Sequence, residues 1–415
     1  MDKPARKYFE RIGVANESND FGLLNDKDIF VVIPCYNEGD IDRTISSIRK
    51  SQEACNIRVQ LVVVVNSHID TPKHILEQNA KTIRHLNTIE RSANFVCHTI
   101  SLSIENKKEA GAGMARKVGM DSVAHQASKQ NREVIICSLD ADCLVSENYF
   151  EEIKNSFSNK RCFASTIYFE HRFKEIADDE QRKGAIIYEL FMRYYFHASK
   201  YYGLPHPMYT VGSCFAVTSS AYIKVGGMNK RIAGEDFYFL HALTTLGKIG
   251  NISRATVYPS ARISDRVLFG TGVSIGNWTQ GDRSIMEAYP LVAFEELGKF
   301  WSIIEKLYSK PLHEIEHILS SHSPAVLSFM KKNNKDLSKL LSIGKSCTSS
   351  KTFVQRVPTF FTALDQQRFL RSYKDGNPHK DLITEATQLL DLMGITSNSE
   401  SIDILTQYRG LDRQI

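Results

Sequence analysis

The fold class of this chain is decided by the stretch Val134-Ile135-Ile136-Cys137-Ser138-Leu139-Asp140-Ala141-Asp142, in which an apolar run ends in two acids. The run is rich in β-branched residues and has the length of a strand buried on both faces. A parallel strand delivers its last residues to the carboxyl edge of its sheet, where open α/β sheets bind ligands. Two carboxylates there suit magnesium or manganese, which prefer oxygen ligands. Because Asp is also a common turn residue, the pair alone does not establish a metal site.

Three earlier apolar runs predict strands of the same kind, over residues 29–33, 59–65 and 95–102. The first ends in the loop Pro34-Cys35-Tyr36-Asn37-Glu38-Gly39, and the second stops at Asn66-Ser67. Helical patterns separate the runs, and Gly111-Ala112-Gly113-Met114-Ala115-Arg116 opens the last helix before Val134. This alternation predicts an α/β fold, with a doubly wound and mostly parallel sheet.

Beyond Asp142 the pattern predicts strands over residues 162–169, 208–218 and 252–258, and a long helical stretch over 174–202. The second half of that stretch is rich in aromatic residues, which we expect to pack against the sheet. After residue 276 the patterns are helical, apart from a polar linker over 333–351. We therefore expect an irregular lead-in over residues 1–27, an α/β domain over 28–280 and a helical carboxyl-terminal region over 281–415.

Composition sets limits on the class of protein. The net charge of +5 over 415 residues is mild and does not indicate nucleic-acid binding. No apolar run approaches the length of a transmembrane helix, and the first residues lack a signal-peptide pattern. The eight cysteines show no C-x-x-C spacing, so neither a zinc site nor a disulfide framework is indicated. We expect a cytoplasmic protein without a transmembrane span, with peripheral contact to the inner face of the membrane left open.

The glycines at 111 and 113 require a separate test. A dinucleotide-binding fold places G-x-G-x-x-G directly after its first strand. Here the glycines lie well into the domain, and Arg116 occupies the place of the third glycine. A dehydrogenase is therefore disfavoured. A helix amino terminus together with Arg116 can instead face phosphate or ribose, and the glycines also allow close packing of a helix on a strand.

Six short motifs occur in an order that resembles family 2 glycosyltransferases. They are Pro34-Cys35-Tyr36-Asn37-Glu38, Asn66-Ser67, the glycine stretch from Gly111 to Gly119, Asp140-Ala141-Asp142, Gly226-Gly227-Met228 and Gly234-Glu235-Asp236. The resemblance covers about residues 28–275 and implies the GT-A fold and an enzyme that transfers a sugar from a nucleotide-diphosphate donor.

The resemblance also implies a set of donor-binding residues. Tyr36 would stack on the base, while Asn37 and Glu38 would bind base or ribose. Asn66 departs from the family, which usually has Asp at this place to contact uracil, and an amide can both donate and accept. The predicted donor-binding residues are Pro34, Tyr36, Asn37, Glu38, Asn66, Gly111, Arg116, Asp140, Arg262 and Arg266. For Arg262 and Arg266, closure over a diphosphate or an anionic acceptor and a role as plain surface charges stay equally open.

Asp140 and Asp142 would bind Mn2+ or Mg2+, which assists departure of the nucleoside diphosphate as a Lewis acid. Some family members supply a further histidine ligand after the E-D helix. No histidine occurs between His241 and His313, so Asp265 or water would have to replace it.

Glu235 and Asp236 resemble the family's acidic pair on the acceptor side. Transfer with inversion needs one base that takes the proton of the acceptor hydroxyl. We assign this role to Asp236, with Glu235 orienting the acceptor. Two acids at a helix amino terminus are also explained by the helix dipole alone.

The sequence thus predicts a metal-dependent glycosyltransferase that transfers with inversion. A UDP-sugar is the expected donor and a GDP-sugar the alternative. The hydroxyl acceptor could be a glycan, a lipid carrier, a metabolite or a protein. Two other classes stay open: a catalytically silent GT-A module that binds nucleotide or glycan, and a nucleotidyltransferase.

Overall fold

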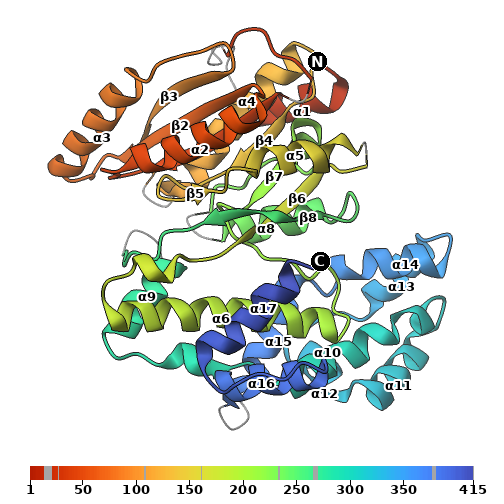
Figure 1. The fold of residues 1–415 in the computed structure, drawn as a ribbon. Coiled ribbons are helices and arrows are strands. Elements are labelled where there is room, and N and C mark those ends of the chain that lie inside the picture. Colours follow the sequence, from red (N-terminus) through yellow and green to blue (C-terminus); the bar gives the residue numbers. More distant parts are fainter. Residues whose placement is uncertain are drawn as a thin grey trace. The chain divides into compact units, whose positions relative to one another are not determined.

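The computed structural model describes residues 1–13, 21–26, 28–106, 109–159, 161–231, 234–264, 270–375 and 380–414. The chain divides into two compact units. Unit 1 comprises Met1–Ala185, Tyr209–Gly276 and Leu411–Ile415, and unit 2 comprises Ile186–Met208 and Asn277–Gly410. The large sheet belongs to unit 1, whereas unit 2 is mainly helical (Figure 1).

The described strands of unit 1 form one eight-stranded sheet in the order β3-β2-β1-β4-β7-β6-β8-β5. Neighbours pair in parallel from β3 to β4 and between β6 and β8, and the remaining pairs are antiparallel. The α/β class with a mostly parallel sheet is therefore confirmed. The strands are β1 (Ile29–Cys35), β2 (Val59–His68), β3 (Phe95–Ile104), β4 (Ile135–Ser138), β5 (Leu144–Val145), β6 (Ala164–Phe169), β7 (Phe215–Thr218) and β8 (Gly250–Tyr258).

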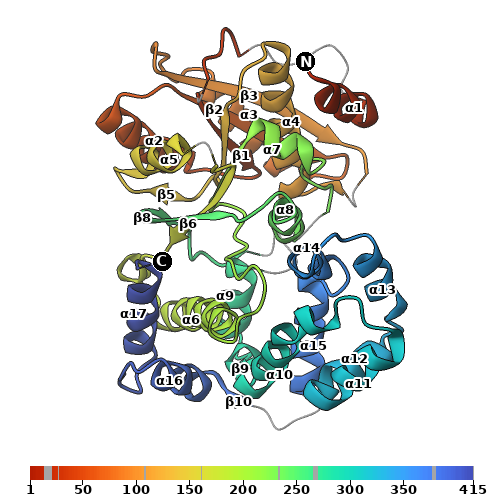
Figure 2. The ribbon, with the colours of Figure 1, turned by 90° about the vertical axis from the view of Figure 1, so that its right-hand side faces the viewer.

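The central strands are apolar because both of their faces are covered. Every residue of β1 and β4 is buried. Helices α1, α4 and α7 pack together, while α2 packs with α5, and Figure 2 shows these two groups on opposite faces of the sheet. Helices of unit 1 are α1 (Lys3–Ile12), α2 (Ile41–Cys55), α3 (Lys73–Leu86), α4 (Ala112–Lys129), α5 (Tyr149–Ser158), η2 (Phe173–Glu175), α7 (Ser219–Lys224) and α8 (Glu235–Leu243).

Two predicted elements of unit 1 differ from the structure. The strand expected over 208–218 is regular only from Phe215, because the chain turns at Gly212 and Ser213 directly before it. The lead-in expected to be irregular contains α1. Its Tyr8 hydroxyl donates to Asp121 of α4 over 2.6 Å, and Asp121 also accepts from Tyr222 and Lys117, so a buried polar network ties α1 to unit 1.

Unit 2 contains the long helix α6 (Asp179–Tyr201) from Ile186 onward. Its aromatic residues contribute to the core of the helical unit, with Tyr194 and Tyr195 against Phe294, rather than to the sheet as expected. The expected linker over 333–351 contains a regular helix, α13. Helix α9 (Thr271–Thr279) begins in unit 1 and ends in unit 2. The remaining elements are η3 (Ser284–Met286), β9 (Glu287–Ala288), α10 (Leu291–Ser302), η4 (Ile304–Leu307), α11 (Leu312–His322), α12 (Pro324–Lys332), α13 (Ser338–Lys345), α14 (Ser350–Arg356), η5 (Val357–Thr359), α15 (Ala363–Asp375), β10 (Lys380–Asp381), α16 (Leu382–Leu392) and α17 (Ser401–Asp412).

A buried ionic group joins two helices of unit 2. Glu189 of α6 accepts from Arg193 of the same helix and from Arg409 of α17, and the side chains of Glu189 and Arg193 are fully buried. None of the helices in the described part of the chain combines the length and apolar character that a membrane crossing requires.

Candidate active site

The candidate site lies at the carboxyl edge of the sheet in unit 1. Strands β1, β4 and β8 run in the same direction, and the loops after them carry Glu38, the pair Asp140 and Asp142, and Arg262. The amino termini of α4 and α8 add Arg116, Glu235 and Asp236. Residues from five separate segments therefore contribute to one cluster, as expected for the edge where parallel strands end.

Arg116 joins Asp140 to Glu235. One terminal nitrogen of its guanidinium donates to Oδ1 of Asp140 and the other donates to Oε1 of Glu235. Arg116 and Glu235 are buried, whereas the Asp140 side chain keeps 37% of its exposure. Burial alone would lower the pKa of Arg116, but the carboxylates of Asp140, Glu235 and Asp236 raise it, so the guanidinium is charged.

Arg262 joins Asp142 to Glu38 in the same way. Its Nε lies 2.9 Å from Oδ2 of Asp142, and its terminal nitrogens donate to both carboxylate oxygens of Glu38. Burial opposes the charge on Arg262, and the two carboxylates raise its pKa. The two acids of the D-x-D turn therefore pair with different arginines.

The D-x-D turn is itself held by α2. The hydroxyl of Thr44 donates to the carbonyl of Ala141 over 2.9 Å, and the Ser47 hydroxyl accepts from the N–H of Val145 over 3.2 Å. The first bond fixes the main chain between the two acids and the second fixes it just after them, so the directions of Asp140 and Asp142 are constrained.

Asp236 has the electrostatics of a base that works near neutral pH. Burial, followed by the charge of Glu235, raises its pKa to about 6, although Arg116 and the N–H of Phe237 oppose the shift. That N–H donates to Oδ1 of Asp236 over 2.7 Å. The side chain keeps some solvent exposure, so an acceptor hydroxyl can approach it.

Two glycines bring the backbone close to the buried charges. A Cβ at Gly113 would collide with the carbonyl of Arg231 and would contact Glu235, so α4 can approach the segment before α8 only with glycine there. A Cβ at Gly212 would lie 2.7 Å from a guanidinium nitrogen of Arg116. Farther along α4, Gly119 allows close contact of the helix with Val32 of β1 and Val64 of β2. Gly111 precedes α4 in an extended conformation.

The expected base-binding residues form a second group at the ends of β1 and β2. Pro34 lies within β1 opposite Val64, and Tyr36 follows the strand and is half-buried. Asn37 has a φ of 51°, a left-handed conformation that asparagine tolerates better than most residues. Asn66 is buried within β2.

Sequence reasoning missed the residues that hold this group. Asn79 and Thr82 of α3 contact the loop that carries Asn37 and Glu38, and Asn79 also contacts Asn66 near the end of β2. A signal was present: Ile75, Asn79, Thr82 and Leu86 follow the spacing of one helix face, and two of the four are polar. Gly212 had no such signal. The predicted residues Arg266 and Asp265 lie outside the described residues.

The carboxylates fit a metal ion that is bound partly by the protein and partly by a substrate. No group of three or more His, Cys, Asp or Glu side chains suited to a metal occurs in the described part of the chain. Asp140 and Asp142 nevertheless present two hard, partly exposed carboxylates. Magnesium and manganese often bind through one or two carboxylates and complete their shell with phosphate oxygens and water.

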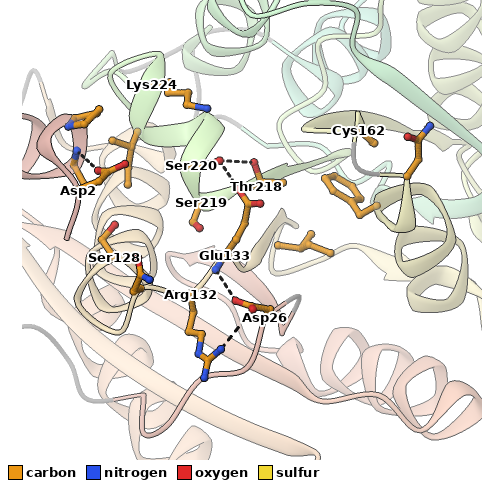
Figure 3. A pocket seen from close by; sticks show the side chains of 17 residues that line it. Asp2, Asp26, Ser128, Arg132, Glu133, Cys162, Thr218, Ser219, Ser220 and Lys224 are labelled. Carbon is orange, nitrogen blue, oxygen red and sulfur yellow. Dashed lines mark hydrogen bonds and ion pairs between the residues drawn. The ribbon is translucent and has the colours of Figure 1, made fainter.

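A separate cavity of about 660 Å³ lies at the opposite edge of the sheet, where β4 begins at Ile135 and β7 ends at Thr218. Its polar lining includes Glu133, which contacts Ser220, and Arg132, which pairs with Asp26 (Figure 3). None of the predicted site residues lines this cavity.

Comparisons with known proteins agree with the class that this site suggests. The family described as Glycosyl transferase family 2 matches residues 30–226. These residues therefore form a family 2 glycosyltransferase domain of the GT-A type, as the sequence predicted, and the chain carries an enzyme domain of the glycosyltransferase class. The comparison with curated proteins found no match.

Solved structures resemble the chain at low identity. TarS residues 1–349 from S. aureus, in complex with UDP-GlcNAc, is 12% identical with a TM-score of 0.39 and covers 85% of this chain and 93% of its own. The mannosyltransferase PcManGT from Pyrobaculum calidifontis, in complex with GDP-Man and Mn2+, is 12% identical with a TM-score of 0.33 and covers 93% of this chain and 94% of its own. Similarity at this level supports no inference about the substrates of this chain.

Proposed function

We propose that the chain is a metal-dependent glycosyltransferase that moves a sugar from a nucleoside-diphosphate donor to a hydroxyl acceptor with inversion. The observation that carries this proposal is the pairing of Asp140 with Arg116 and of Asp142 with Arg262 beside Asp236. It combines the two requirements of the reaction at one sheet edge: cationic groups for a departing diphosphate and a base for the acceptor.

The charges of the cluster support metal dependence. Among the described residues the cluster contains five carboxylates, namely Glu38, Asp140, Asp142, Glu235 and Asp236, and two guanidinium groups. A diphosphate would bring further negative charge to this excess of acids. A divalent cation held by Asp140 and Asp142 would offset the repulsion and, when bound, would supply Lewis-acid assistance to the leaving group.

The residues of the chain then have distinct tasks. Asp236 removes the proton of the acceptor hydroxyl, whose oxygen forms a bond to the anomeric carbon on the face opposite the leaving group. The bond between that carbon and the diphosphate oxygen breaks, and its electron pair leaves with the nucleoside diphosphate. Arg116 and Arg262 release part of their hold on the two acids and donate to phosphate oxygens, for which a guanidinium is well suited. Glu235 keeps Arg116 in place and orients the acceptor.

We expect the donor to be a UDP-sugar, with a GDP-sugar as the alternative. We would screen nucleoside diphosphates and nucleotide sugars by thermal shift with and without Mn2+, then measure release of nucleoside diphosphate from the stabilising donor. A manganese-dependent shift and slow donor hydrolysis are the expected results. Binding of nucleotide without turnover of any donor would identify a silent module, and release of pyrophosphate from a nucleoside triphosphate would identify a nucleotidyltransferase.

A further inference from the structure

Helix α3 directs three polar side chains at the loop that follows β1. The amide nitrogen of Gln78 and the hydroxyl of Thr82 both donate to the carbonyl of Glu38, over 3.2 Å and 2.9 Å. Thr82 and Asn79 are buried. Buried polar groups on a helix face cost stability unless they are hydrogen-bonded, so this face is built to hold backbone rather than to fill a core.

Asn79 makes a contact that its two neighbours do not. Its Oδ1 accepts from the main-chain N–H of Asn37 over 2.9 Å, and its Nδ2 donates to the carbonyl of Asn66 over 3.0 Å. One side chain therefore connects the loop after β1 with the end of β2. A carboxamide carries an acceptor oxygen and a donor nitrogen side by side at the tip of one short side chain.

The two segments that Asn79 connects carry the expected base-binding residues. Tyr36 and Asn37 belong to the first, and Asn66 belongs to the second. Without the bridge, the left-handed turn at Asn37 would lose the acceptor of its N–H, and the buried carbonyl of Asn66 would lose a donor. The separation of these segments sets the width of any pocket that receives a flat ring between them.

We infer that Asn79 is a positioning residue that fixes the two walls of the nucleobase pocket and thereby sets the affinity for the donor nucleotide. The inference rests on the proposed function, because it assumes that a nucleotide binds at the ends of β1 and β2. Asn79 acts through Asn37 and Asn66. Its contribution is preorganisation, since a pocket held open before binding loses less entropy when the ligand arrives.

The test compares a ligand that has a base with one that lacks it. Isothermal titration in Mn2+ would measure UDP and GDP against inorganic pyrophosphate, for the wild type and for Asn79→Ala. We expect Asn79→Ala to weaken the preferred nucleoside diphosphate by about tenfold, corresponding to the loss of two hydrogen bonds of ordinary strength, and to leave pyrophosphate within about twofold. In turnover assays the KM for the donor should rise while kcat at saturating donor stays nearly constant.

Two variants on the same helix serve as controls. Lys81→Ala removes an exposed side chain of α3 and should change the affinity for neither nucleoside diphosphate nor pyrophosphate. Thr82→Val removes a bond to Glu38 but leaves the bridge between the segments intact, so its effect on nucleoside diphosphate should be smaller than that of Asn79→Ala. Should Asn79→Ala fail to fold, Asn79→Asp keeps the acceptor for Asn37 and loses the donor for Asn66, and the same two affinities are compared.

Unchanged nucleoside-diphosphate affinity in the Asn79 variant would overturn the inference. Equal weakening of nucleoside diphosphate and pyrophosphate would also overturn it, because it would show general damage to the site. If the wild type binds pyrophosphate but neither nucleoside diphosphate, the proposed function fails and the inference fails with it.

Discussion

Asp142 and Arg262 form an ion pair, with Oδ2 of the acid 2.9 Å from Nε of the arginine, although 120 residues separate them in the chain. The same arginine holds the buried carboxylate of Glu38. A cation that binds Asp142 must therefore compete with Arg262 for the carboxylate, and a diphosphate that binds Arg262 must compete with Asp142 and Glu38 for the guanidinium. The strength of ligand binding at this end of the site depends on how readily Arg262 turns from carboxylate to phosphate.

Asp142→Asn tests the metal assignment. The amide keeps the shape of the side chain but loses the charge, so we expect Mn2+-dependent affinity for nucleoside diphosphate to fall at least about tenfold. Mutation of residues that only support metal ligands already costs about tenfold in metal affinity, and loss of a ligand should cost no less. Titration of the nucleotide at fixed Mn2+ measures this. Glu53→Gln, an exposed acid on α2, is the matched control and should behave as wild type. Equal affinity in Asp142→Asn and wild type would remove Asp142 from the metal site.

Asp236→Asn tests the base. Because the amide cannot take a proton from the acceptor, transfer should fall by about 10²-fold or more. Donor binding should persist, since Arg116 keeps its two carboxylate partners, Asp140 and Glu235, in this variant. Single-turnover transfer and donor titration on the same preparation separate the two effects. A transfer rate near that of the wild type would place the base elsewhere.

The pH dependence follows from the raised pKa of Asp236. A base must be ionised to work, so kcat/KM should fall below about pH 6, where Asp236 takes up a proton, and should level off above it. Glu235 is the neighbour whose charge raises this pKa most. Glu235→Gln should therefore move the acidic limb to lower pH, even though the rate itself also falls. A limb that stays in place or moves upward in this variant would contradict the assignment of Asp236.

Gly212→Ala tests the position of Arg116. The added methyl group would lie within 3.0 Å of three guanidinium atoms, so Arg116 must shift away from Asp140 or Glu235. We expect a marked loss of transfer with a modest change in melting temperature, because the methyl displaces the end of a side chain rather than backbone. Gly410→Ala, where no atom lies within 4 Å of the added methyl, is the control and should retain full activity. Normal transfer in Gly212→Ala would show that Arg116 need not hold this position.

The sequence predicted much of the fold because local chemistry determines it. Apolar β-branched runs have few alternatives to buried strands, and parallel strands must end at a common edge. Those two facts were sufficient to expect Glu38, Asn66 and the D-x-D acids near one another. The antiparallel strand β7 was predicted too long, because a turning segment before Phe215 has the composition of a strand but not its pairing.

What the sequence alone determined is therefore which residue types occur at the carboxyl edge and on which elements. The tertiary structure decided how they pair. Arg116 reaches Asp140 and Glu235, and Arg262 reaches Glu38 across 224 positions of the chain, so no local pattern encodes these partners. The bridge made by Asn79 is of the same kind, since it depends on where α3 packs against the loop after β1 and the end of β2. Periodicity describes each element by itself, whereas ion pairs and hydrogen bonds between elements exist only once the elements are packed.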